Sequence, residues 1–129
     1  MYNSLWFDSL NKPFLNPPSW IFAPVWTILY LLIFSSLVIF ILKKTNESKI
    51  RGFIYFGIQL WLNIIWSPVF FYMENIGLAL IIIILMDIFA ILTLKELYKI
   101  EKISGILFVP YILWILFATY LNIAYFVLN

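Results

Sequence analysis

Long apolar stretches alternate with short polar segments along this chain of 129 residues. Residues 20–42, 53–73, 76–94 and 106–128 contain a single charged side chain between them, that of Asp87. Each stretch is long enough to cross a bilayer, which requires about 20 apolar residues in a helix. Lipid offers the backbone no hydrogen-bond partners, and the alternating pattern of a barrel strand is absent. The pattern therefore predicts an all-α fold: a polytopic membrane helix bundle with four transmembrane helices in one domain, residues 1–129.

Residues 1–19 differ from the rest of the chain. Asp8 and Lys12 interrupt their apolar positions, and Pro13, Pro17 and Pro18 exclude a continuous helix. We expect this segment to be an extramembrane loop that precedes the first span.

Basic residues are concentrated in two connecting segments. Segment 43–52 contains Lys43, Lys44, Lys49 and Arg51, segment 95–105 contains Lys95, Lys99 and Lys102, and the remaining basic residue is Lys12. Cytoplasmic loops of membrane proteins carry an excess of Lys and Arg. Both basic loops, 43–52 and 95–105, are therefore expected in the cytoplasm, with the two termini and the turn at 74–75 on the opposite face.

Composition supports a membrane protein and narrows the chemistry. The chain is 65% hydrophobic and 11% charged, whereas soluble domains carry roughly 25% charged residues. It contains no Cys and no His, so disulfides and the usual metal ligand are excluded, and a net charge of +2 gives no indication of nucleic-acid binding. No catalytic triad, metal cluster or phosphate-binding loop is present. We expect no metal and no cofactor.

Polar and aromatic side chains recur at helical spacing within three of the spans. In the second span they are Gln59, Asn63 and Trp66; in the fourth, Tyr111, Trp114, Ala118, Asn122 and Tyr125; in the first, Ala23, Trp26 or Thr27, and Tyr30. Each set lies on one helix face, and the three faces together predict a flat-walled, mostly apolar site with a few hydrogen-bonding groups. Such a site suits a large planar apolar ligand.

Polar side chains within the spans have two alternative roles. Amides within a membrane also join helices by hydrogen bonds without binding a ligand. Asp87, the single ionisable group deep in a span, is a candidate for proton coupling because charge in a membrane is costly.

Three segments carry a resemblance to a known family. The first has Trp6, Phe7, Leu10, Lys12, Pro13, Pro17, Pro18, Trp20, Pro24, Val25, Trp26, Leu29 and Tyr30. The second has Gln59, Leu60, Leu62, Asn63, Trp66, Pro68, Phe70, Phe71, Gly77, Leu78, Ala79 and Leu80. The third has Pro110, Tyr111, Trp114, Phe117, Ala118, Thr119, Leu121 and Asn122. In this order and spacing the chain resembles the translocator protein family, also called tryptophan-rich sensory proteins or peripheral benzodiazepine receptors (TspO/MBR).

The resemblance implies a fold and a function. Family members are five-helix membrane bundles, frequently homodimeric, that bind porphyrins such as protoporphyrin IX and haem, and some bind cholesterol or benzodiazepine-type drugs. It implies that Trp26 and Trp114 occupy the tryptophan positions tied to porphyrin contact and breakdown. By similarity the ligand-binding residues are Ala23, Trp26, Tyr30, Asn63, Trp66, Trp114, Ala118, Leu121 and Asn122. The bacterial relatives, linked to light, oxygen and stress, imply a prokaryotic cell membrane.

Three departures from the family pattern stand out. The chain begins where the family's first loop begins, so the usual first helix is absent, either in a natural short form or because an upstream segment is missing from this sequence. Leu15 and Leu78 replace frequent tryptophans, and Ile82 replaces a frequent acid; Asp87 lies about 140° further around the helix. The animal cholesterol-type motif is absent because no basic residue follows Tyr125.

Three functional hypotheses follow. The leading one is a membrane-embedded binding protein for tetrapyrroles or similar flat apolar ligands, with a sensory, regulatory or transport role. The second is a light- and oxygen-dependent breakdown of protoporphyrin IX, for which Trp26 and Trp114 would be the catalytic residues. The third is a small transporter that uses Asp87 for proton coupling.

Overall fold

The structure is a computed structural model that describes residues 9–11 and 19–129, and the described residues form a bundle of four long helices. They are α2 (Phe22–Leu42), α3 (Ile50–Ser67), α4 (Ile76–Ile100) and α5 (Lys102–Leu128); a 3₁₀ turn, η1 (Ser19–Ile21), precedes α2, and a π-helical turn, η2 (Pro68–Tyr72), extends α3. All four are long and apolar enough to cross a membrane, and the described ranges contain no strand. The all-α membrane bundle predicted from the sequence is confirmed.

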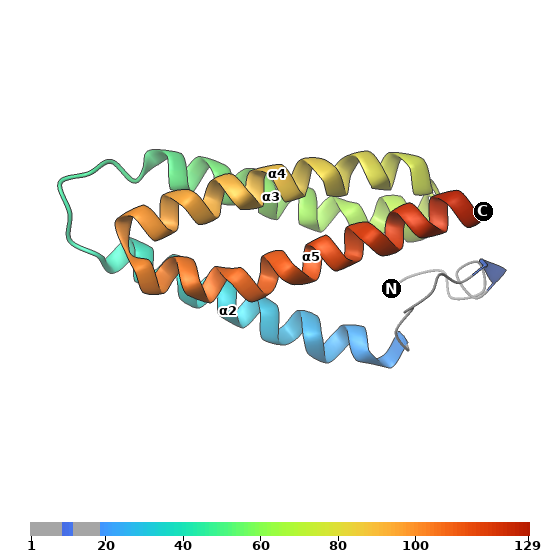
Figure 1. The fold of residues 1–129 in the computed structure, drawn as a ribbon, viewed down its shortest axis with the longest axis horizontal. Helices are drawn as coiled ribbons and strands as arrows, with labels where there is room; N and C mark the ends of the chain where they lie inside the picture. Colours follow the sequence, from blue (N-terminus) through green and yellow to red (C-terminus); the bar gives the residue numbers. More distant parts are fainter. Residues whose placement is uncertain (1–8, 12–18) are drawn as a thin grey trace.

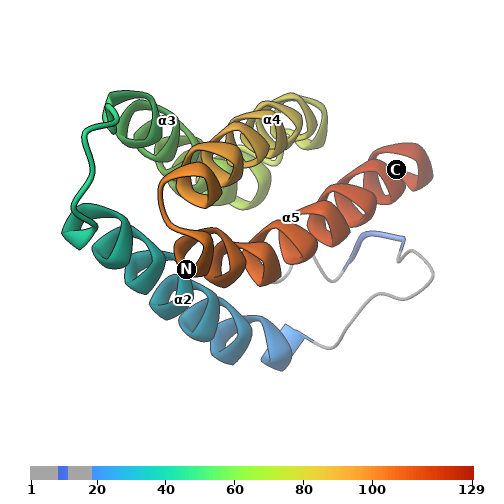
Figure 2. The ribbon, with the colours of Figure 1, turned by 60° about the vertical axis from the view of Figure 1, so that its left-hand side comes forward.

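The helices pack in the order α3, α4, α5, α2 rather than in chain order. Helix α4 packs extensively against both α3 and α5, and α2 packs mainly against α5. The two views agree on this arrangement, with α3 and α4 side by side and α2 alongside α5 (Figure 1 and Figure 2). Chain neighbours α2 and α3 are joined by the extended loop 43–49, but their helix bodies make few contacts.

The helix ends correct the predicted spans at the basic face. The expected loop 95–105 is almost entirely helical, because α4 continues to Ile100 and α5 begins at Lys102, leaving Glu101 between them. Helix α3 also begins earlier, at Ile50. Long lysine side chains can pack their stems along a helix while the ammonium reaches the membrane surface. Charge therefore marks where a span meets water but not where the helix ends.

Hydrogen bonds and an ion pair join the helices near this basic end. Lys43 Nζ lies 3.0 Å from Glu101 Oε2, and this ion pair holds the pKa of Glu101 below its usual range. Deeper in the bundle, Ser36 Oγ donates to the carbonyl of Ser104 at 2.6 Å, and Ser104 Oγ donates to the carbonyl of Ser36 at 2.7 Å. Both serines are fully buried, so α2 and α5 approach closely here.

Gly105 permits an equally close approach between α4 and α5. A Cβ at this position would lie 2.8 Å from the Cα of Tyr98 and 2.7 Å from its Cβ. Backbone and Cβ atoms cannot rotate away from such a contact. The tight connection at Glu101 therefore depends on a glycine at 105.

The opposite end of the bundle holds both the N-terminal part of the chain and the C-terminus. The backbone N–H of Asn11 donates to Asn129 Oδ1 at 3.0 Å, and Asn11 Nδ2 donates to the carbonyl of Leu128 at 3.0 Å. Glu74 turns the chain with a positive φ of 54°, and Asn75 Oδ1 accepts from Leu78 N at 3.0 Å to cap α4. Asn11, the C-terminus and the 74–75 turn therefore share one end of the bundle; the rest of the predicted loop, 1–8 and 12–18, lies outside the described residues.

Candidate functional site

A chain of hydrogen bonds links the polar stripes of three helices in the middle of the bundle. Tyr30 OH in α2 donates to Asn63 Oδ1 in α3. Asn63 Nδ2 donates to Tyr111 OH in α5 at 2.9 Å, and Tyr111 OH donates to Gln59 Oε1 at 2.6 Å. Gln59 and Tyr111 are completely buried, and Asn63 is nearly so. Polar side chains from α2, α3 and α5 therefore converge on one point. Nearer the basic end, ring contacts of Phe34 with Phe56 and of Phe40 with Phe53 also join α2 to α3.

Aromatic rings surround the two tyrosines, Tyr30 and Tyr111, of this series of hydrogen bonds. Trp26 lies edge to face against Trp114, with ring centroids 6.3 Å apart at an interplanar angle of 88°. The Trp26 ring also contacts Tyr30 at 5.7 Å and Tyr111 at 6.5 Å, and Phe22 packs on Trp114 at 6.0 Å. Both tryptophans are half-buried. The two indoles singled out in the sequence thus lie against each other, one from α2 and one from α5.

A second polar contact lies closer to the 74–75 turn. Trp66 Nε1 donates to Asn122 Oδ1 at 2.9 Å, and Asn122 Nδ2 donates to the carbonyl of Ile76 at 3.2 Å. Asn122 is buried, and Trp66 stacks on Phe70 with centroids 5.1 Å apart. These bonds tie α3, the start of α4 and α5 together, so this amide joins helices whether or not it also meets a ligand.

The remaining predicted site residues differ in how deeply they are buried. Leu121 is buried and Ala118 is half-buried on the same helix as Trp114. Ala23 is exposed, and Thr27 is exposed with its hydroxyl donating to the carbonyl of Ala23 at 2.8 Å. Of the two alternatives left open on α2, Trp26 therefore lies in the aromatic cluster and Thr27 does not.

Three buried polar atoms have no hydrogen-bond partner among the described residues: Gln59 Nε2, Asp87 Oδ1 and Trp114 Nε1. A buried donor or acceptor without a partner costs about 1–3 kcal/mol. Two of the three, the amide of Gln59 and the indole N–H of Trp114, are donors on the polar stripes. The side-chain amides of Asn63 and Asn122 have hydrogen-bond partners within the described part of the bundle, but the Gln59 N–H₂ group and the Trp114 N–H group do not.

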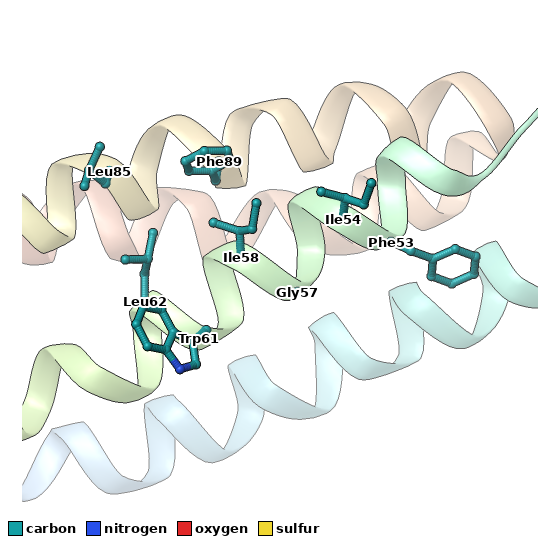
Figure 3. A pocket seen from close by; sticks show the side chains of 8 residues that line it. All are labelled: Phe53, Ile54, Gly57, Ile58, Trp61, Leu62, Leu85 and Phe89. Atoms are coloured by element: carbon teal, nitrogen blue, oxygen red, sulfur yellow. The ribbon is translucent and has the colours of Figure 1, made fainter.

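A groove with a cavity volume of about 630 Å³ opens elsewhere, on the outer side of α3 and α4. Figure 3 shows the side chains that line it: Phe53, Ile54, Gly57, Ile58, Trp61, Leu62, Leu85 and Phe89. All of these side chains are apolar, and Trp61 is 62% exposed. Trp61 is two residues from Gln59, about 200° around the helix, so the groove faces away from the amide stripe. It contains none of the predicted site residues.

In the described part of the chain, no three or more His, Cys, Asp or Glu side chains lie close enough together to hold a metal ion. Two side chains have a larger role than their sequence positions indicated. The hydroxyl of Tyr111 connects two amides of α3, and the hydroxyl of Thr119 lies 2.6 Å from Asp87 Oδ2. The signal for Tyr111 was its place three residues before Trp114 on the polar face. No comparable signal pointed to Thr119, because its partner is on another helix.

Comparison with known proteins agrees with this architecture. A sequence model of the TspO/MBR family matches residues 1–128. The tryptophan-rich protein TspO of Archaeoglobus fulgidus is 42% identical over 127 residues, which cover 96% of this chain and 80% of the relative. The tryptophan-rich sensory protein of Cereibacter sphaeroides is 38% identical over 117 residues, 91% of this chain and 72% of the relative. The human translocator protein is 33% identical over 124 residues, 91% of this chain and 70% of the relative. The chain is an integral membrane protein that belongs to the TspO/MBR family.

Proposed function

We propose that this protein binds tetrapyrroles, such as protoporphyrin IX or haem, or similar flat apolar ligands within the membrane. The observation that carries the proposal is the pair of contacting indoles, Trp26 and Trp114, beside the Tyr30–Asn63–Tyr111 hydrogen-bond chain. Aromatic rings offer a planar ligand large contact surfaces at low entropic cost. The proposed site lies where α2 meets α5, and its ligand would enter on the side where α2 and α3 pack least.

The unpartnered donors define what the ligand should carry. The N–H of Trp114 is buried without an acceptor among the described residues. Hydrogen bonds to charged acceptors contribute roughly 1.5–3 kcal/mol, about twice as much as those to neutral groups. A tetrapyrrole combines a flat apolar ring with carboxylates, so it matches both the aromatic surface and the donor. Haem would bind without imidazole ligation, because the chain contains no His, and it would be a ligand rather than a cofactor.

The names of the relatives suggest two biological settings. One relative is called a tryptophan-rich sensory protein and another a translocator protein. A sensory or regulatory role needs ligand occupancy to change the bundle, and a transport role needs the ligand to leave it on the other side. In both settings the ligand-binding step comes first, so it is the step to test.

The test is protoporphyrin IX binding to the purified protein in lipid nanodiscs, followed by quenching of tryptophan emission. Trp114→Phe keeps most of the ring surface but removes the N–H, and should weaken binding about ten- to a hundredfold, since one hydrogen bond to a carboxylate contributes about 1.5–3 kcal/mol. Trp61→Phe, on the outer groove, is the matched control and should leave the affinity unchanged. Binding no tighter than that of an unrelated four-helix membrane protein would overturn the proposal.

A second candidate function, the light-dependent breakdown of protoporphyrin IX, is favoured by the same Trp26–Trp114 contact. Indole is far easier to oxidise than benzene, so two adjacent indoles can supply an electron to an excited porphyrin. Trp26→Phe should then reduce light-dependent porphyrin loss far more than it reduces binding. Equal proportional losses would assign Trp26 to binding alone, and no loss of porphyrin under illumination in the unsubstituted protein would remove this candidate.

A further inference from the structure

Asp87 is an acidic side chain buried in the middle of α4, far from any described basic residue of the same helix. It is 9% exposed and lies 11 residues from Ile76, where the helix begins, a distance of about 17 Å along the axis. The next charged residue, Lys95, is a further eight residues on, about 12 Å away along the helix. A carboxylate this deep in a membrane is expensive unless it is paired or protonated.

The hydrogen-bond geometry around Asp87 distinguishes its two protonation states. Thr119 Oγ1 on α5 lies 2.6 Å from Asp87 Oδ2 and 2.7 Å from the carbonyl oxygen of Ile115. A threonine hydroxyl has one hydrogen and can donate to only one of them. If Asp87 were ionised, one of these two short oxygen–oxygen contacts would contain no hydrogen at all.

A protonated Asp87 resolves both contacts. Asp87 then donates from Oδ2 to Thr119 Oγ1, and Thr119 donates to the carbonyl of Ile115, so that each short contact contains one hydrogen. The remaining oxygen, Oδ1, becomes a neutral carbonyl acceptor, and its lack of a partner among the described residues costs far less than it would for a carboxylate.

The helices packed against α4 offer no cation that would favour the ionised form. Their titratable side chains within the spans are tyrosines: Tyr30 in α2, Tyr55 in α3, Tyr72 in η2, and Tyr111, Tyr120 and Tyr125 in α5. Their charged side chains, Arg51 in α3 and Lys102 in α5, lie in the first turn of each helix at the membrane surface. The surroundings of Asp87 are therefore neutral in the described part of the bundle.

We propose that Asp87 and Thr119 form a proton-binding site inside the membrane, in which Asp87 is protonated at rest and donates to the Thr119 hydroxyl. When the proton leaves for the aqueous phase, the Thr119 hydroxyl keeps its hydrogen but donates it to the new carboxylate, and the hydrogen bond from Thr119 to the carbonyl of Ile115 breaks. Thr119 directly follows Ala118 and precedes Asn122 by one turn, so proton release disturbs α5 at the proposed ligand site. The proton is a second ligand, and its binding does not depend on whether the protein binds tetrapyrroles.

The proposal can be tested by infrared spectroscopy of the protein in lipid nanodiscs, without porphyrin, using aspartate labelled with ¹³C at the side-chain carboxyl. The chain has two aspartates, Asp8 and Asp87, so Asp8→Asn leaves a single labelled carboxyl. We expect a protonated C=O stretching band that shifts in D₂O and persists at about pH 7, three pH units above the ordinary aspartate pKa of about 3.9. A band that appears only as the pH falls to about 4 would overturn the proposal.

Two variants at position 119 test the partner. Thr119→Val is similar in shape but has no hydroxyl, so the Asp87 band should move to the frequency of a carboxyl without that hydrogen bond. Thr119→Ser retains the hydroxyl and should leave the band close to its original position. An unchanged band in Thr119→Val would show that Asp87 donates elsewhere and would overturn the assignment of Thr119. The main measurement uses the native Asp87 and Thr119, so its result does not depend on whether either variant folds.

Discussion

Replacing Tyr111 by Phe tests whether the hydrogen-bond chain in the centre of the bundle stabilises the fold. The Tyr111 hydroxyl accepts from Asn63 Nδ2 at 2.9 Å and donates to Gln59 Oε1 at 2.6 Å. Phenylalanine retains the ring, including its contact with Phe108 at a centroid distance of 5.2 Å. The substitution therefore removes one oxygen atom and leaves two buried amides each short of a partner.

The expected loss of stability can be worked out from these two bonds. Side-chain hydrogen bonds between membrane helices average about 0.6 kcal/mol each in the best-studied case, which gives a lower figure of about 1 kcal/mol for the pair. Leaving a buried polar group unsatisfied costs about 1–3 kcal/mol, and Gln59 is fully buried with its other polar atom, Nε2, already unpartnered among the described residues. We expect Tyr111→Phe to reduce the free energy of unfolding by about 1–3 kcal/mol.

The assay is reversible unfolding in mixed detergent micelles with increasing sodium dodecyl sulfate, followed by circular dichroism. Tyr98→Phe is the matched control, because Tyr98 is 48% exposed and its hydroxyl makes no hydrogen bond to a described residue. The double variant Gln59→Met with Tyr111→Phe removes a partner as well, and should lose less stability than the two single changes added together.

A loss for Tyr111→Phe equal to that for Tyr98→Phe would refute the reasoning. It would mean that the amides of α3 find other partners once the hydroxyl is gone. Strict additivity in the double variant would refute the direct bond between Tyr111 and Gln59, even if the single change were destabilising.

Three further predictions concern the basic end of the bundle. Gly105→Ala should reduce the free energy of unfolding by about 1–3 kcal/mol because its Cβ meets backbone, whereas Gly57→Ala, where a Cβ meets nothing within 4 Å, should change it by less than about 0.5 kcal/mol; equal effects in detergent unfolding would contradict the close approach. Because the ion pair with Lys43 lowers the folded-state pKa of Glu101, its contribution should be present above the unfolded value of about 4.3 and be lost as the pH falls through the folded value; the midpoint of unfolding in Glu101→Gln should lack this decline on the acid side. Lys44 should resist a membrane-impermeant amine reagent applied outside sealed cells, and rapid labelling would reverse the predicted orientation.

The helices themselves were predictable because lipid leaves no alternative to them. Twenty or more apolar residues in a row settle both the secondary structure and the span, whatever the individual propensities. The helix ends were not predictable to the same degree. Lys95 and Lys99 lie within α4, and their long side chains allow the helix to continue to the surface. The hydropathy of the sequence indicates where a span leaves the membrane, and the helix can continue beyond that point.

The convergence of the polar stripes was predictable in part. Helical spacing placed Gln59 and Asn63 on one face, and burial of these costly groups required that face to point inward. Spacing could not show that Tyr30 reaches Asn63 rather than Gln59, since that depends on how far α2 leans from α3. Trp61 illustrates the same limit. The sequence shows that it lies deep in the span, but in lipid an apolar side chain is equally stable facing outward or inward. Hydropathy therefore could not predict that Trp61 faces outward.

The reciprocal Ser36–Ser104 contact has a consequence for how the protein is assembled. The two serines are 68 residues apart, and α2 is the first of the described helices to be synthesised, while its main neighbour α5 is the last. During synthesis α2 must therefore reside in the bilayer or the insertion machinery while Ser36, which is buried in the folded bundle, still lacks its partner Ser104. Helices α3 and α4 can pair as soon as both have emerged, but α2 cannot find its place until translation is almost finished. Helices α3, α4 and α5 can pack in the order in which they are made, whereas α2, the first described helix to be made, waits for the last. A stalled or truncated chain that ends before α5 would therefore lack the helix against which α2 mainly packs.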